Sequence, residues 1–289
     1  MSDHFAQEWL RLRESADLAA RDPGLMRQFI AALPPSRPLR VIDLGAGTGG
    51  NARALLPRIT GNQHWLLIDR DRDLLAAQAE EFTVWARRQG YPVSAGGGHI
   101  IINARPARWQ IEAVPLDLAK DLASLGEITA DCLTASAFFD LVSAPWLEAL
   151  VALIAQRRWP LLAALTEDGR REWRPPDERD AIVGEAFARH QRRDKGFGPA
   201  LGGTAAAMFE SLLADAAFSV GQQASDWRLG ARDGALLEAL LAGEARAAVE
   251  AAADATVPIT AWQTARHEML SNDQLEVTIG HCDILALPA

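Results

Sequence analysis

The stretch VIDLGAGTGG at residues 41–50 constrains the fold of this 289-residue sequence more than any other feature. The short apolar run LRVIDL at 39–44 leads into it and is typical of a strand buried on both faces. The glycines permit a tight turn, and we expect a helix over residues 51–59 to follow. A buried strand, a glycine turn and a helix in this order favour a parallel α/β sheet.

The rest of the chain continues this alternation of strand and helix. The spacing of apolar residues predicts strands at 64–69, 109–117, 130–140 and 159–167, with helices at 73–89 and 144–158. It predicts two helices within 4–32, broken at Asp22-Pro23-Gly24, and later helices at 178–192, 203–218, 235–253 and 258–270. A strand at 218–229 and a last strand at 274–288 complete the pattern. We therefore predict a doubly wound, Rossmann-like α/β sheet covered on both faces.

The glycine loop fits two cofactor fingerprints at once. Gly45, Gly47 and Gly50 have the dinucleotide spacing G-x-G-x-x-G, while Asp43, Gly45, Gly47 and Gly49 have the D-x-G-x-G-x-G spacing found in S-adenosylmethionine enzymes. Glycines required only by a tight turn are the simpler alternative. A carboxylate at position 43 would repel a diphosphate but attract a cationic sulfonium and an ammonium group. The charge of Asp43 therefore favours S-adenosylmethionine.

Asp69 ends the second predicted strand, 24 residues after Gly45. An acid at this place can accept hydrogen bonds from both ribose hydroxyls of a bound adenosine. Both cofactor classes share this feature, so Asp69 supports a nucleoside without choosing between them. The alternative is an ordinary helix N-cap.

Four segments in order, VIDLGAGTGG, LLIDRD, VPLDL and FFDLV, carry a resemblance to a known family. Over roughly residues 38–167 the sequence resembles the class I S-adenosylmethionine-dependent methyltransferases. The resemblance implies a seven-stranded sheet with an antiparallel terminal strand, and methyl transfer as the activity. The positions that it implies for cofactor binding are Asp43, Gly45, Ala46, Gly47, Thr48, Gly49, Asp69, Arg70, Asp117, Leu118, Ser136 and Ala137.

Within that set, the resemblance places the methionine part on Asp43 and residues 45–49, the ribose on Asp69, and the adenine on Asp117 and Leu118. Residues 134–137 would lie under the methyl donor. Asp117 is equally well explained as a turn residue. The chain lacks an N-P-P-Y type tetrad after the fourth strand, which disfavours methylation of adenine or glutamine by that route.

The predicted reaction is in-line methyl transfer to a small molecule, which depends mainly on alignment and exclusion of water. A general base is optional, and the sequence identifies no catalytic residue. Asp140 and Trp146 flank the expected mouth of the site and are candidate substrate contacts, although Trp146 also suits a helix core. An NAD(P)-dependent oxidoreductase and a non-catalytic S-adenosylmethionine-binding interaction protein remain the alternatives.

We expect a single domain over 1–289. A helical cap over about 4–36 would lie over the cofactor as part of a lid, and Phe5 is among its apolar positions. The segment 94–108 reads as an irregular insertion with a hairpin arm. The polar segment 167–203 reads as a second insertion at the carboxyl edge of the sheet, where substrates bind.

Composition limits the kinds of partner that the protein is expected to bind. A formal net charge of -9 and a pI near 5.2 argue against nucleic-acid binding. Arginine outnumbers lysine 27 to 2, which we attribute to genome composition, so that no single arginine is a signal. The six histidines show no metal-ligand spacing, and Cys132 and Cys282 suit core positions. Because no signal peptide or membrane span is evident, we expect a soluble cytoplasmic protein; the oligomeric state is left open.

Overall fold

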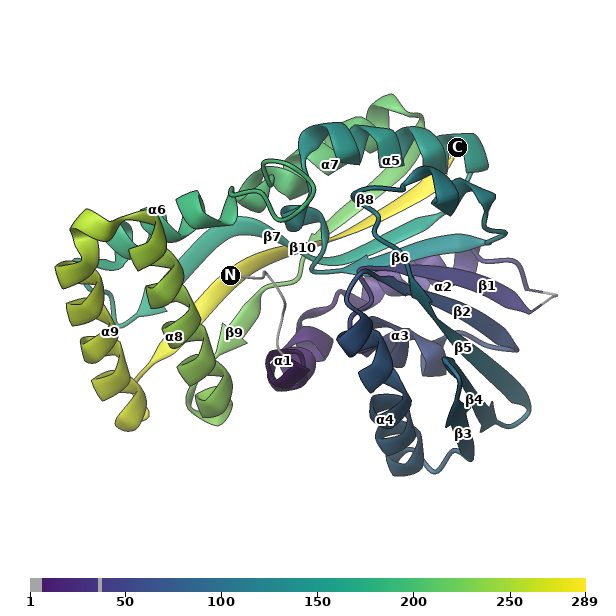
Figure 1. Cartoon of the computed structure of the whole chain (residues 1–289), viewed down its shortest axis with the longest axis horizontal. Helices are drawn as coiled ribbons and strands as arrows, with labels where there is room; N and C mark the ends of the chain where they lie inside the picture. The colour runs from purple at the N-terminus through teal and green to yellow at the C-terminus, as the bar shows by residue number, and fades with distance from the viewer. Residues whose placement is uncertain (1–6, 36–37) are drawn as a thin grey trace.

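The computed structural model describes residues 7–35 and 38–289 (Figure 1). The predicted cap position Phe5 lies outside this range. The strands are β1 (Leu39–Leu44), β2 (Gln63–Asp69), β3 (Val93–Gly96), β4 (His99–Ala104), β5 (Ala107–Pro115), β6 (Cys132–Ser136), β7 (Leu161–Arg174), β8 (Phe218–Ala224), β9 (Trp227–Leu229) and β10 (Glu276–Pro288). The helices are α1 (Gln7–Ala20), α2 (Pro23–Ala32), α3 (Gly50–Leu55), α4 (Arg72–Arg88), α5 (Ala144–Arg157), α6 (Asp180–Gln191), α7 (Ala205–Asp215), α8 (Gly234–Ala251) and α9 (Thr256–Ser271).

One mixed sheet organises the molecule. Its strands follow the order β3-β4-β5-β2-β1-β6-β7-β10-β8, and β9 pairs with β10 off this path. Strands β5, β2, β1, β6 and β7 are parallel, and the chain-terminal β10 runs antiparallel to both β7 and β8. The seven strands from β5 to β8 are the sheet with an antiparallel terminal strand that the resemblance implies. The predicted α/β fold class is confirmed.

The predicted strand count was too low, because the described residues form ten strands in this sheet. The segment 94–108 contributes the hairpin β3–β4, and β4 pairs antiparallel with β5, so the hairpin extends the sheet at its edge. The predicted strand at 218–229 is divided into β8 and β9, which pair with different parts of β10. Strand β7 continues seven residues beyond the predicted end at Glu167, to Arg174.

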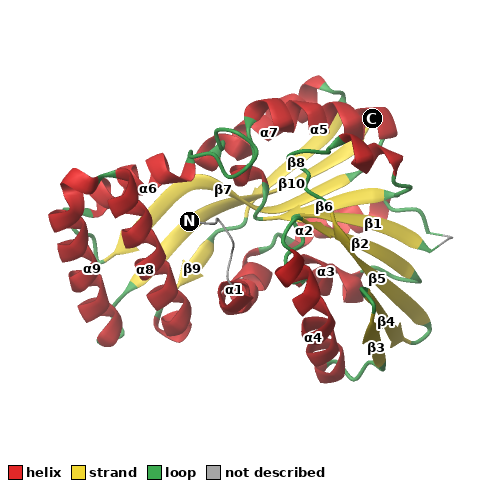
Figure 2. Cartoon of the chain, in the orientation of Figure 1, coloured by secondary structure: helices red, strands yellow, loops and turns green. Residues whose placement is uncertain are grey.

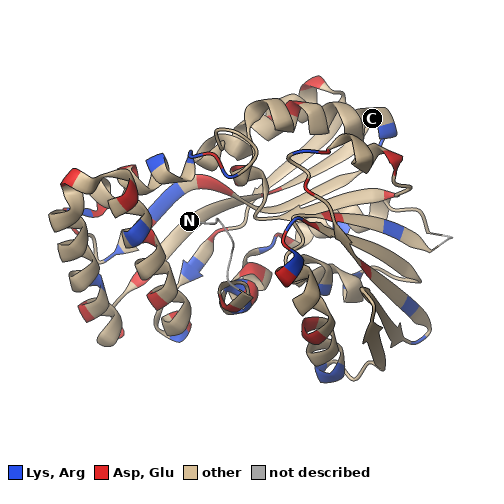
Figure 3. Cartoon of the chain, in the orientation of Figure 1, with Lys and Arg blue, Asp and Glu red and all other residues tan. Residues whose placement is uncertain are grey.

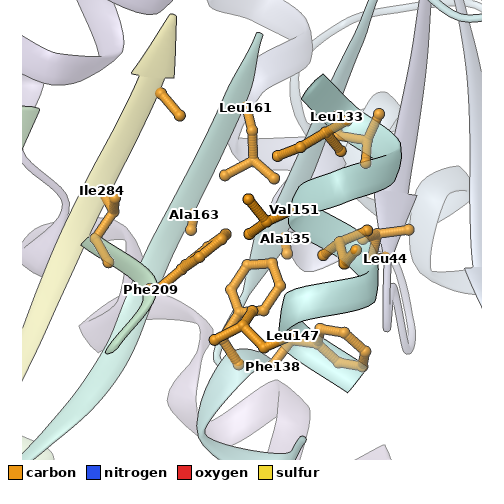
Figure 4. Packing of buried hydrophobic residues seen from close by; sticks show 14 of the residues in the cluster. Leu44, Leu133, Ala135, Phe138, Leu147, Val151, Leu161, Ala163, Phe209 and Ile284 are labelled. Carbon is orange, nitrogen blue, oxygen red and sulfur yellow. The ribbon is translucent and has the colours of Figure 1, made fainter. Parts of the chain in front are cut away.

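Helices cover both faces of the sheet (Figure 2). Side chains from α5 and α7 pack on one face against residues such as Leu133, Leu161 and Ile284 (Figure 4). Side chains from α2, α3 and α4 pack on the other face around Trp65 and Leu67. Because successive residues of a buried strand point to opposite faces, both faces are apolar, as the sequence pattern predicts.

The predicted break between the first two helices is confirmed at Asp22. Its side chain accepts a hydrogen bond from the backbone N–H of Leu25 (2.6 Å), and Pro23 occupies the first turn of α2. The two helices then separate, because α2 buries Leu25 and Phe29 against the sheet while α1 has no fully buried residue.

A second lobe rises on the extended ends of β7 and β10 (Figure 1). Helices α6, α8 and α9 pack there around a separate apolar cluster that includes Trp173, Leu237 and Trp262. Helix α1 lies between this lobe and α3, with contacts to α8, β9 and α3 (Figure 1). Within the described ranges, none of the helices combines the length and the apolar character needed to cross a bilayer.

Candidate functional site

A cavity of about 1380 Å³ opens at the carboxyl ends of β1, β2 and β6 and reaches across to the second lobe. The sheet is extended in opposite directions from β1, since β2 lies on one side and β6 on the other. Open α/β sheets bind ligands at such a switch point. Because ligand pockets usually occupy about 300–1,000 Å³, this cavity has room for two molecules. We name its two parts the glycine-loop end and the lobe end.

The glycine-loop end is built on residues 45–49, between β1 and α3. Gly45 and Gly49 have positive φ angles of 60° and 85°. A Cβ atom on Gly45 would overlap the Phe138 ring, and one on Gly49 would overlap the Phe82 ring. These two glycines therefore have a structural requirement of their own. Gly45, Ala46, Gly47 and Thr48 also line the cavity, although the backbone N–H groups of Ala46 and Gly47 already donate within the protein.

Asp43 is a fully buried carboxylate in the cavity wall. Its Oδ1 accepts hydrogen bonds from Asn51 Nδ2 (2.6 Å) and Thr134 Oγ1 (2.8 Å). Its Oδ2 has no hydrogen-bond donor among the residues that the structure describes. Burial raises the pKa of Asp43 to about 6, although the hydrogen bonds from Asn51 and Thr134 oppose that shift. At neutral pH the wall therefore carries a buried negative charge with one oxygen unsatisfied.

Arg21 is the cation beside it. The residue is buried, lines the cavity and donates from Nη2 to Ser136 Oγ (3.1 Å). Its Nε finds no acceptor within the described part of the chain. Burial lowers the pKa of Arg21, and the nearby carboxylates of Asp283, Asp17 and Asp43 oppose that shift. The same cavity thus presents a buried carboxylate and a buried guanidinium that influence each other electrostatically, which is complementary to the two charges of an α-amino acid.

The Asp69 side chain connects the end of β2 to the glycine loop through a hydrogen bond. Its Oδ2 accepts from the backbone N–H of Gly47 (2.8 Å) and its Oδ1 from the backbone N–H of Asp71 (2.9 Å). The N-cap of α4 is Asp71 instead, whose side chain accepts from Asp73 and Leu74. The alternative interpretation of Asp69 as the helix N-cap is therefore wrong. Burial raises the pKa of the Asp69 carboxyl, and the hydrogen bonds from Asp71 and Gly47 oppose that shift.

Helix α1 forms one side of the cavity with residues that include Leu10 and Glu14. The Glu14 carboxylate pairs with Arg53 on α3 (2.8 Å), and Arg53 also donates to the carbonyl of Thr48 in the glycine loop. Glu81 on α4 pairs with Arg11 (2.5 Å). Polar contacts therefore hold α1 against α3 and α4. Of the predicted helical cap, α1 borders the cavity and α2 packs on the sheet, and the role of α1 as a lid stays a prediction.

The lobe end is rich in charge. Figure 3 shows charged segments on α1 and along the extended part of β7. Glu167 and Arg171 on β7, Glu244 on α8 and His281 on β10 line the cavity, as does Asp140, which follows β6. Burial and the neighbouring Glu167 carboxylate raise the pKa of Asp140 to about 7, while its own backbone N–H and Arg13 oppose that shift. A carboxyl group with this pKa can exchange protons near neutral pH.

Comparisons with known proteins find structural likeness only. No protein-family model and no curated protein matches the chain. Solved structures that it resembles include an S-adenosylmethionine-dependent methyltransferase from Thiobacillus denitrificans in complex with S-adenosyl-L-homocysteine (14% identity, 99% of this chain and 100% of that one, TM-score 0.45). Another is the cyclopropane synthase MmaA2 from Mycobacterium tuberculosis (11% identity, 98% of this chain and 94% of that one, TM-score 0.49). A third is a putative methyltransferase from Bacillus halodurans (13% identity, 91% of this chain and 99% of that one, TM-score 0.46). These likenesses are remote and assign no activity to this chain.

Most of the predicted cofactor residues meet at the cavity. The wall contains Asp43, Gly45, Ala46, Gly47, Thr48, Asp69, Arg70, Leu118, Ser136 and Ala137, together with the predicted substrate contact Asp140. The fold therefore brings together residues from the ends of β1, β2 and β6 and from the segment after β5. Their role in binding stays a prediction.

Three of the predicted residues lie off the wall. Gly49 is the N-cap of α3 and packs against Phe82. Asp117 accepts from the backbone N–H of Ala119 (3.2 Å), and a salt bridge to Lys120 (2.8 Å) lowers its pKa. These are the contacts of a turn residue, and Asp117 would have to reorient to reach an adenine.

Trp146 also faces away from the cavity. Its ring packs against Phe138 and Phe197 with centroids 5.7 and 5.2 Å apart, and its Nε1 donates to the carbonyl of Leu118 (2.7 Å). Trp146 therefore supports the wall from behind, as a core aromatic.

Sequence reasoning missed Arg21, Glu167, Arg171 and His281. The abundance of arginine hides Arg21, and the other three lie in the segments predicted as a polar insertion and as the last strand. A signal was present for β7, because Trp173 alternates with charged residues in GRREWR as it would in a strand with one buried face. In the described residues no group of three His, Cys, Asp or Glu side chains is arranged to hold a metal ion.

Proposed function

We propose that this protein transfers a methyl group from S-adenosylmethionine to a small molecule by in-line displacement. One observation carries the proposal: the unsatisfied carboxylate of Asp43 and the guanidinium of Arg21 line the same cavity next to the glycine loop and interact electrostatically, at the switch point of the sheet. A ligand that carries an α-amino acid group satisfies both charges at once.

Different residues at the glycine-loop end suit different parts of this cofactor. Asp43 would hold the ammonium and Arg21 the carboxylate of the methionine part. Asp69, at the end of β2, would accept from the ribose hydroxyls, as the resemblance implies. Leu118 supplies an apolar surface for the adenine. When bound, S-adenosylmethionine supplies a methyl group on a positively charged sulfur.

A dinucleotide suits this wall poorly. A diphosphate on the loop would lie near the buried Asp43 carboxylate and near Glu14, which also lines the cavity. Arg53 does not offset Glu14 for a ligand, because the two already pair at 2.8 Å. Thermal unfolding distinguishes the two cofactors: S-adenosylmethionine raises the Tm and NADH does not. A rise with NADH alone supports the oxidoreductase instead.

Calorimetric titration with S-adenosylhomocysteine tests the site. The wild type binds it, and Asp69→Ala binds it about tenfold or more weakly, because a charged acceptor and the anchor of Gly47 are lost. Asp73→Ala is the matched control, since Asp73 is exposed and lies off the cavity. No binding by the wild type, or equal affinity of Asp69→Ala, refutes the assignment.

The non-catalytic alternative needs a separate experiment. The cavity exceeds the volume of one ligand, and a second molecule beside the cofactor is what methyl transfer requires. Incubation of the protein with labelled S-adenosylmethionine and a metabolite extract therefore yields a labelled small molecule. Binding of the cofactor without any labelled product favours the interaction protein.

A further inference from the structure

The lobe end contains a cluster of five side chains that the proposed cofactor does not use. We define the acceptor chamber as Asp140, Glu167, Arg171, Glu244 and His281, all of which line the cavity. Glu167 and His281 are cross-strand partners in the β7–β10 ladder. Asp140 lies three residues after Ala137, which lines the same cavity at the end of β6. The chamber therefore adjoins the place where the resemblance puts the methyl group.

His281 presents an unused acceptor to this chamber. The residue is 6% exposed, and its Nδ1 lies 3.1 Å from the carbonyl oxygen of Ile279. Because a carbonyl only accepts, Nδ1 carries the proton and Nε2 keeps its lone pair. Nε2 has no hydrogen-bond partner among residues 7–35 and 38–289. Burial lowers the pKa of His281 to about 4, helped by Arg13 and Arg171 and opposed by Asp168 and the Ile279 carbonyl. The ring is therefore neutral at physiological pH.

Asp140 adds a second acceptor. Its Oδ1 is buried and has no donor in the described structure. The charged groups that influence it are Glu167 on β7 and Arg13 on α1. Arg13 is already held by two hydrogen bonds to Asp17 on its own helix (2.9 and 3.1 Å), so it does not neutralise Asp140 fully.

The charges of the chamber leave an excess of carboxylate. Arg171 is its one cation, and it is shared between Glu167 (3.4 Å) and Glu244 (3.2 Å) while its guanidinium lies over the Phe187 ring. The other Glu167 oxygen, Oε2, accepts a hydrogen bond from Gln191. Farther out, Glu250 pairs with both His190 and Arg193 (3.3 and 3.6 Å). A ligand with a phosphate or carboxylate at this place would face Asp140 and Glu167, whereas a cation with several N–H donors would satisfy them.

We propose that the acceptor chamber binds a small-molecule amine as the methyl acceptor, with Glu167 and His281 accepting its N–H groups and Asp140 receiving the proton that its nitrogen loses. This inference rests on the proposed function. An ammonium group offers three donors, which matches the three acceptors, whereas a hydroxyl offers one. After Asp140 takes one proton, the nitrogen lone pair forms a bond to the methyl carbon, and the methyl–sulfur bond breaks with its electron pair left on sulfur.

Sinefungin tests the amine assignment even though the methyl acceptor itself is not identified. It is an analogue of the cofactor in which a carbon bearing an ammonium replaces the methylated sulfur, so that its ammonium points to the acceptor chamber. The wild type binds sinefungin about tenfold more tightly than S-adenosylhomocysteine at pH 8, by one charge-assisted hydrogen bond. The preference shrinks at pH 6, where Asp140 is mostly protonated. The ratio of the two affinities cancels the titration of Asp43, because both ligands carry the same amino acid group.

Three variants complete the experiment. Asp140→Asn binds sinefungin and S-adenosylhomocysteine with similar affinity at both pH values. His281→Leu loses part of the preference for sinefungin at both pH values. The exposed control Asp73→Asn behaves as the wild type does. A preference that Asp140→Asn retains, or none in a wild type that binds S-adenosylhomocysteine, overturns the amine assignment alone. If neither ligand binds the wild type, the proposed function fails as well.

The charge of the labelled product provides a second test. A metabolite extract is incubated with labelled S-adenosylmethionine, and the unreacted cofactor, itself a cation, is first removed by chromatography against a sample without the protein. The label that remains in the product is retained on a cation-exchange resin, since a methylated amine stays cationic. Label found only in anionic products overturns the proposal.

Discussion

At the scale of single residues, Asp43 combines a cost to folding with a use in binding. Its folded pKa of about 6 lies above the ordinary value of 3.8, so the folded state prefers the protonated form. The stability that this group contributes is therefore present below its unfolded pKa and is lost as the pH rises through 6. Carboxyl groups whose pKa is shifted by burial are frequent at functional sites, and this supports the proposed role of Asp43.

Asp43→Asn should separate the two effects. At pH 8 the ligand-free variant is more stable than the wild type by roughly 1–3 kcal/mol, since one pKa unit is about 1.4 kcal/mol, and the difference disappears near pH 4. Its affinity for S-adenosylhomocysteine falls about tenfold or more, because a neutral amide replaces the partner of the ammonium. Urea unfolding at both pH values and calorimetry measure these changes. A variant that is less stable at pH 8 contradicts the interpretation.

The corresponding prediction for the carboxylate of the methionine part concerns Arg21. Arg21→Met weakens S-adenosylhomocysteine about tenfold or more, as a charge-assisted hydrogen bond is lost, and leaves 5′-methylthioadenosine, which has no amino acid group, unaffected. Arg27→Met is the control, because Arg27 is exposed on α2. Calorimetry with both ligands is the measurement. Equal losses for the two ligands would mean that Arg21 acts on the fold and not on the methionine part.

The sequence could predict Asp43 and Asp69 because each follows a buried strand at a fixed distance from the glycines. Arg21 and His281 have no such marker. Arg21 reaches Ser136 and Asp43 from a helix end far away in the sequence, and arginine is common in this chain. Only the packing of α1 across the strand ends makes it a cavity residue.

At the scale of elements, α1 depends on its polar contacts more than on burial. It has no fully buried residue, and Glu14 and Arg53 connect it to the glycine loop. Segments with few buried apolar contacts open most readily. A bound cofactor under α1 should therefore close it further.

Glu14→Gln tests this role of α1. The variant releases S-adenosylhomocysteine several-fold faster, while its Tm stays within a few degrees of the wild type, because a partly exposed ion pair contributes about 1 kcal/mol or less. Hydrogen exchange of α1 slows on ligand binding in the wild type and less in the variant. Glu8→Gln, at an exposed position of the same helix, is the control. Unchanged exchange in α1 on binding would exclude it as a lid.

Element positions followed well from apolar periodicity in the parallel part of the sheet. The strand ends did not, since beyond Glu167 only Trp173 of β7 is fully buried, and the dense charge of this segment predicts an insertion. Its partner β10 determines the extension, because Trp173 pairs with Val277 across the ladder. Such long-range pairing is not visible in the local sequence.

At the scale of the whole molecule, the second lobe supplies a further wall to the cavity at the strand ends, with residues such as Glu244. Arg266 is fully buried and joins α9 to α6, since it donates to Asp180 and to the carbonyl of Pro175. Trp262 donates to the same Asp180 oxygen (2.7 Å). The lobe was not predicted, because its three helices are individually ordinary and only their shared core makes them a unit.

Arg266→Ala should destabilise this lobe strongly. Removal of one partner of a fully buried ion pair costs about 3–5 kcal/mol, and because Asp180 is partly exposed we expect a loss toward the lower end of that range. Arg228→Ala, at an exposed position of β9, changes the free energy of unfolding by about 0.5 kcal/mol or less. Urea unfolding of the two variants is the measurement. A small effect of Arg266→Ala would mean that the contact with Asp180 contributes little to holding the lobe together.

The structure of the protein crystallised with both S-adenosylhomocysteine and NAD⁺ tests the central claim most directly. We predict that S-adenosylhomocysteine occupies the glycine-loop end, with its amino acid group between Asp43 and Arg21 and its ribose at Asp69. A diphosphate resting on residues 45–49, with the carboxylate of Asp43 turned away from the ligand, would contradict the account.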